Sequence, residues 1–62
     1  MLNIGEIVLD RKTGGTGLVL NRWSDYSVEL DLTLPDGRQQ IITRSTADLE
    51  RMSRQKPRRG RW

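Results

Sequence analysis

The chain has 62 residues, with 11 Lys and Arg against 8 Asp and Glu and a net charge of +3. A chain of this length forms one small domain. Because it has no Cys and no His, disulfides, thiolate metal sites and histidine-based acid–base chemistry are excluded. No basic region followed by a long apolar run opens the sequence and no segment is long enough to span a membrane, so we expect a cytoplasmic protein.

Charge is divided unevenly along the chain. Residues 1–52 contain six Lys or Arg and eight Asp or Glu, a net charge of −2, whereas the last ten residues, SRQKPRRGRW, contain five cations and no acid. We therefore expect two parts: a folded domain over residues 1–52 and a basic, flexible tail over residues 53–62. Charge asymmetry of this kind is typical of an arm for an anionic partner.

Strand patterns dominate the first part. The clearest is SVELDLTL, where hydrophobic and polar residues alternate as in a half-buried strand, followed by the tight-turn signal Pro35-Asp36-Gly37. In chain order we predict strands over residues 6–11, 17–23, 27–34, 38–43 and 49–52, with one hydroxyl-capped helical turn over 45–48. The predicted core consists of Val8, Val19, Val28, Leu30, Leu32, Leu34 and Ile41.

The glycine-rich stretch KTGGTGLVL, residues 12–20, invites comparison with a phosphate-binding loop. Such a loop must lead into a helix whose N-terminal amides face the anion. Here the lysine precedes the glycines and the following residues, LVLNRW, favour a strand. We therefore predict a hairpin turn in which at least one of Gly14, Gly15 and Gly17 has a positive φ.

Five short strands separated by turns, with a helical turn before the last, predict a small all-β, SH3-like barrel. The segments GEIV (5–8), GTGLV (15–19), a turn containing Gly37, and ADLERM (47–52) resemble the Tudor-like SH3 barrels at the C-termini of some DNA helicases and in transcription-coupled proteins. The resemblance covers residues 4–52. It implies a docking module for RNA polymerase or nucleic acid.

A second resemblance is to the type II, plasmid-borne dihydrofolate reductases, short SH3-like chains that assemble as tetramers around a pore. It is based on GEIV, GLV and ADLERM in the same order, and on Gln40 and Ile41, which match part of the pore-lining Val-Gln-Ile-Tyr stretch. Ile42 stands where those enzymes have Tyr. This resemblance implies a tetrameric enzyme.

Few residues suggest catalysis. Glu29 and Asp31 share one face of a predicted strand, an arrangement consistent either with acid–base chemistry or with ordinary solvated polarity. The serines have no histidine to activate them, and the acidic residues have no calcium-loop spacing. We therefore predict a non-enzyme with no cofactor and no metal.

The candidate binding residues fall into two groups. Arg22, Trp23 and Tyr26 flank the second predicted turn, where they would contact a base or a protein, although Trp23 could instead complete the core. In the tail, cations would neutralise phosphates and an aromatic ring would stack on a base, unless the tail only aids solubility. The tail residues are Arg54, Lys56, Arg58, Arg59, Arg61 and Trp62.

Together these features predict a monomeric or weakly oligomeric binding module, with a regulatory role, that holds nucleic acid through its tail and uses the barrel as a docking surface. The first alternative is a protein–protein adaptor, for example one that docks on RNA polymerase. The tetrameric reductase is a more distant alternative. Small modules of this type are typical of phages and mobile elements.

Overall fold

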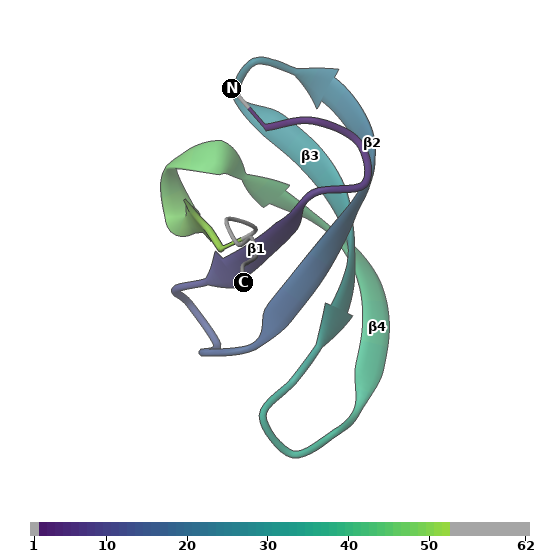
Figure 1. The fold of residues 1–62 in the computed structure, drawn as a ribbon, viewed down its shortest axis with the longest axis vertical. Helices are drawn as coiled ribbons and strands as arrows, with labels where there is room; N and C mark the ends of the chain where they lie inside the picture. Colours follow the sequence, from purple (N-terminus) through teal and green to yellow (C-terminus); the bar gives the residue numbers. More distant parts are fainter. Residues whose placement is uncertain (1, 53–62) are drawn as a thin grey trace, which may run out of the picture.

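The computed structural model describes residues 2–52. This part of the chain is all-β, as predicted, with a 3₁₀ turn before the last strand (Figure 1). The elements are β1 (Ile7–Asp10), β2 (Thr16–Ser24), β3 (Ser27–Thr33), β4 (Gln39–Ser45), η1 (Thr46–Asp48) and β5 (Leu49–Arg51). The predicted hydroxyl cap is Ser45, whose side chain accepts a hydrogen bond from the amide of Ala47.

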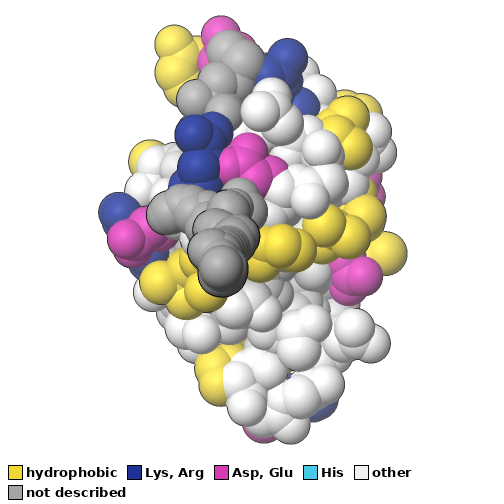
Figure 2. Space-filling view, viewed as in Figure 1, with side chains coloured by type: hydrophobic (Ala, Val, Ile, Leu, Met, Phe, Trp, Pro, Cys, Tyr) yellow, Lys and Arg dark blue, Asp and Glu magenta, His cyan; other side chains and the backbone are white. Residues whose placement is uncertain are grey.

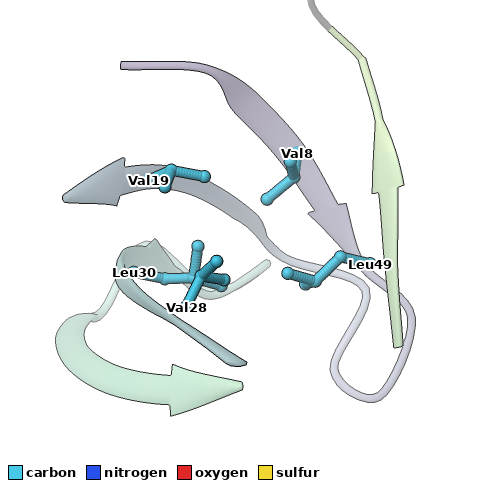
Figure 3. Packing of buried hydrophobic residues seen from close by; sticks show 5 residues of the cluster. All are labelled: Val8, Val19, Val28, Leu30 and Leu49. Carbon is cyan, nitrogen blue, oxygen red and sulfur yellow. The ribbon is translucent and has the colours of Figure 1, made fainter. Parts of the chain in front are cut away.

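The strands form one antiparallel sheet in the order β4-β3-β2-β1-β5. The sheet is strongly curled, so that β1 and β2 lie opposite β3 and β4 across the interior (Figure 3). It is not closed, because β4 and β5 are the two edges and are not paired with each other within residues 2–52. Instead, η1 carries the chain from one edge to the other.

The core consists of aliphatic side chains on the inner face of the curl. Val8, Val19, Val28, Leu30 and Leu49 form one cluster (Figure 3), and Leu32 is also fully buried. The alternation predicted for β3 is confirmed, since its burial alternates residue by residue along the whole strand. All of these except Leu49 were predicted, so they confirm five of the seven predicted core residues.

The prediction that Ile41 belongs to the core is wrong. Ile41 is 63% exposed, whereas Ile42 packs against the core. In the β3–β4 register Leu30 pairs with Ile42 and Asp31 with Ile41, and paired residues share one face of a sheet. Leu34, which was also predicted to lie in the core, is only half-buried. It follows the last residue of β3 and belongs to the turn that sets the β3–β4 register.

The glycine-rich stretch is a turn between two strands, as predicted. Gly14 has φ 81°, in the region that favours glycine, and β2 begins directly after the turn. Gly15 is required for a different reason: a Cβ atom there would lie 2.4 Å from the carbonyl oxygen of Thr33. The loop between β1 and β2 therefore packs directly onto the end of β3.

A buried ion pair joins strands that are not neighbours in the sheet. Asp10, at the end of β1, is fully buried, and its Oδ2 lies 2.9 Å from Nη2 of Arg44 on β4. Arg44 reaches the interior because it pairs with the buried Val28 and shares its face. This contact connects the two layers of the curled sheet through side chains.

Candidate binding surface

The hairpin between β2 and β3 carries the sequence-predicted surface residues at the top of the view in Figure 1. Trp23 is 62% exposed and Tyr26 78% exposed, and Arg22 is also exposed. The alternative that Trp23 completes the core is therefore wrong. The β2–β3 register shifts between Arg22 and Ser24, and the core is already filled by aliphatic residues closer to the centre of the sheet.

Hydrogen bonds hold this hairpin in one position. The backbone amide of Tyr26 donates to Ser24 Oγ (3.1 Å), which closes the turn locally. The amide of Thr46 in η1 donates to the Tyr26 carbonyl (3.0 Å), and Thr46 Oγ1 donates to the carbonyl of Asp25 (3.2 Å). The exposed rings therefore extend from a backbone that is fixed at both ends of the turn.

A shallow hollow lies beside the hairpin on the side of η1. It is lined by Leu2, Asp25, Thr46, Leu49 and Arg51. The guanidinium of Arg51 forms an ion pair with Glu6, so charge within the hollow is partly neutralised. Sequence patterns did not indicate this feature, because its lining residues come from three separate stretches of the chain.

The glycine-rich loop is arranged around its own carboxylate. Asp10 accepts hydrogen bonds from Thr13 Oγ1 (2.7 Å) and from the amide of Lys12 (3.3 Å). The amide of Gly14 donates to the Asp10 carbonyl, and that of Gly15 to Thr13 Oγ1. These amides are not directed at a common point outside the loop, and a buried negative charge lies next to them, so the loop is unsuited to an anion.

Within residues 2–52, the Asp10 carboxyl has a pKa that clearly departs from its ordinary value. Burial would raise the pKa of its carboxyl, but the hydrogen bonds from Thr13, Arg44 and Lys12 and the positive charge of Arg44 outweigh burial and lower that pKa below its ordinary value. Our sequence reasoning missed both Asp10 and Arg44. The only available signal was local, an Asp three residues before a Thr at the start of a turn.

The remaining candidates are dispersed. Glu29 and Asp31 are both half-buried on β3, and Glu29 accepts a hydrogen bond from Asn21 Nδ2 (3.0 Å). Gln40 and Ile41, which carry the reductase resemblance, lie exposed on the edge strand β4. Within residues 2–52 no group of three or more acidic side chains is close enough to hold a metal ion, and none of the described elements is a helix that could cross a membrane.

The predicted tail residues Arg54, Lys56, Arg58, Arg59, Arg61 and Trp62 lie outside the described residues. The described part contributes the other predicted group, Arg22, Trp23 and Tyr26, on a single hairpin. Comparisons with protein-family models, with curated proteins and with solved structures found no match to this chain.

Proposed function

We propose that the chain is a small non-enzymatic binding module of the SH3-like class that holds single-stranded nucleic acid. The observation that carries the proposal is the separation of charge: residues 1–52 have a net charge of −2, and residues 53–62 carry five cations and a Trp. A polyanion is attracted to the basic segment and repelled by the rest, so the segment from Arg54 to Trp62 provides most of the affinity.

The strand order supports the barrel part of this proposal. The assignment to a small SH3-like barrel is based on five antiparallel strands in the order β4-β3-β2-β1-β5, curled around one core, and on the 3₁₀ turn before the last strand. The Asp10–Arg44 ion pair connects the layers where backbone pairing between the edge strands is missing. A folded body of this kind is suited to presenting a recognition surface.

The β2–β3 hairpin supplies that surface. Trp23 and Tyr26 offer exposed aromatic rings on which bases stack, and Arg22 supplies a nearby cation. Stacking on aromatic rings is tolerant of sequence because every base has a π-face. We therefore assign the basic segment to the phosphates and the hairpin to the bases and to orientation.

A salt titration with a fluorescent single-stranded oligonucleotide tests the assignment. If Arg54, Lys56, Arg58, Arg59 and Arg61 each neutralise one phosphate, the slope of log affinity against log salt approaches about −3.5. Replacing both Arg58 and Arg59 with Gln then reduces its magnitude by about 1.4. Arg11→Gln is the matched control, since this exposed cation of the folded part lies 3.6 Å from Glu50. An unchanged slope in the double variant contradicts the proposal.

The adaptor is the second candidate function, and the hairpin itself favours it. Two exposed aromatic side chains on a turn held by hydrogen bonds from η1 are also suited to anchoring a protein partner such as RNA polymerase. For an adaptor, Tyr26→Ala abolishes capture of the partner whereas the Gln substitutions at Arg58 and Arg59 leave it intact. The reductase alternative requires a tetramer, which light scattering of the full chain detects.

A further inference from the structure

A row of side chains crosses the outer face of the sheet, opposite the core. Ile7 pairs with Leu18, Leu18 with Asp31, and Asp31 with Ile41, so these residues lie side by side on β1, β2, β3 and β4. The three hydrophobic members are exposed: Ile7 by 40%, Leu18 by 37% and Ile41 by 63%. Figure 2 shows that hydrophobic side chains form a band across the surface of the molecule.

Asp31 interrupts this apolar row with a charge that has no partner among the described residues. Its carboxylate is half-buried between Leu18 and Ile41 and has no hydrogen bond or ion pair with any residue in the range 2–52. The paired strand residues of the outer face include no Lys or Arg, whereas Glu29 and Glu50 lie on the same face. Because Arg11 lies 3.6 Å from Glu50, Asp31 and Glu29 supply the acidic character of this otherwise apolar face.

These properties restrict what binds there. Nucleic acid is repelled by the carboxylates, and the same face of a second copy would place like charges opposite each other. A matching occupant has cations that reach Asp31 and an apolar or aromatic side chain that covers Leu18 or Ile41. Residues 53–62 of this chain have that composition, with five cations and Trp62.

The chain also enters the row at the right place. The amide of Met52 donates to the carbonyl of Ile7 (3.1 Å), so the last described residue lies beside the first hydrophobic member of the row. From Ile7 to Ile41 the row crosses three strand spacings, about 14 Å along the sheet. Ten residues span up to about 33 Å, which is sufficient even though the sheet is curled.

We propose that residues 53–62 bind the outer face of their own sheet, with Arg side chains at Asp31 and Trp62 against the neighbouring hydrophobic residues, and that nucleic acid competes with this face for the segment. The contact itself does not depend on the proposed function, whereas the competition does. Binding to nucleic acid then requires release of the segment from Asp31, which makes the outer face a regulatory surface.

Fluorescence of Trp62 tests the contact without nucleic acid. In the full-length Trp23→Phe variant Trp62 is the only Trp, and acrylamide quenching reports its accessibility. We expect Trp62 to be less accessible than in a free peptide of residues 53–62 at low salt, and equally accessible once Asp31→Asn or Ile41→Ser is added. Asp36→Asn is the matched control, because it removes the same charge from the exposed turn before β4 and leaves Trp62 protected.

Two results overturn the contact. One is equal quenching of Trp62 in the variant and in the free peptide. The other is protection that increases with protein concentration, which assigns the bound segment to a second copy. Oligonucleotide affinity separates the two proposals: Asp31→Asn strengthens binding by about twofold to fivefold if the face competes. If Trp62 is protected but no oligonucleotide binds, the contact stands and the proposed function is contradicted. If the oligonucleotide binds but Trp62 is not protected, the proposed function stands and the contact is contradicted.

Discussion

The two hairpin connections of β2 differ in how their polar groups are used. In the loop before β2, the amides of Lys12 and Gly14 and the Thr13 hydroxyl donate to Asp10, and the Gly15 amide donates to Thr13 Oγ1. Gly15 also packs against Thr33. In the turn after β2, hydrogen bonds fix only the backbone, and the side chains of Trp23 and Tyr26 face solvent. The glycine-rich loop, although more prominent in the sequence, is structural, and the turn with ordinary residues is the better binding candidate.

The largest effect on the first connection is expected from Arg44→Met. The substitution leaves Asp10 as a buried carboxylate without its cationic partner, which costs about 3 kcal/mol in the free energy of unfolding. The cost is at the low end for such pairs because Thr13 and Lys12 still donate to Asp10. Urea denaturation of the variant measures it. A loss below about 1 kcal/mol would show that the ion pair does not connect the layers of the sheet.

Gly15→Ala should destabilise the same loop by about 1 to 3 kcal/mol, because the added Cβ atom forces apart the backbones of the loop and of β3. Gly37→Ala is the control: Gly37 has φ 93° but open space around it, so only the conformational cost of about 1 kcal/mol applies. Thermal unfolding followed by circular dichroism compares the two variants. Equal losses would contradict the role assigned to close packing.

Acid should weaken the loop through Asp10. Because the pKa of this carboxyl is lowered by folding, its contribution is fully present above the ordinary Asp pKa of about 3.9 and is lost as the pH falls through the lower folded value. We expect the free energy of unfolding to decrease below about pH 4, by at most about 1.4 kcal/mol per pH unit from this group. Asp10→Asn should remove that component, and an identical pH profile for the variant would refute the assignment.

The smallest effects on stability are expected at the second connection. Tyr26→Ala and Trp23→Ala should change the free energy of unfolding by about 0.5 kcal/mol or less, since both rings are mostly exposed. Under the proposed function each substitution weakens oligonucleotide binding by about 1 to 3 kcal/mol with an unchanged salt slope, because stacking releases no counterions. Calorimetric unfolding and a binding titration on the same samples test both parts. If these variants lost much stability but still bound the oligonucleotide, the turn after β2 would be structural and would not be the binding surface.

Local patterns were sufficient for most of the secondary structure. The alternation in residues 27–34 gives β3, Pro35-Asp36-Gly37 gives the turn before β4, and Ser45 gives the cap of η1. Each depends on residues within a few positions of one another, whose backbone preferences and hydrogen bonds act over that short range. The all-β class and the structural role of the glycine-rich turn followed from the same kind of signal.

Tertiary structure decided which side chains are inside and which meet across the sheet. Ile41 and Ile42 are adjacent and chemically equivalent, and only the register with β3 places Ile42 toward the core. Trp23 is hydrophobic enough for the interior, but the aliphatic cluster is already complete without it. Asp10 and Arg44 are separated by 34 positions, and the curl of the sheet brings them together. Pairing over such a separation depends on how the whole sheet folds, which no short segment of the sequence specifies.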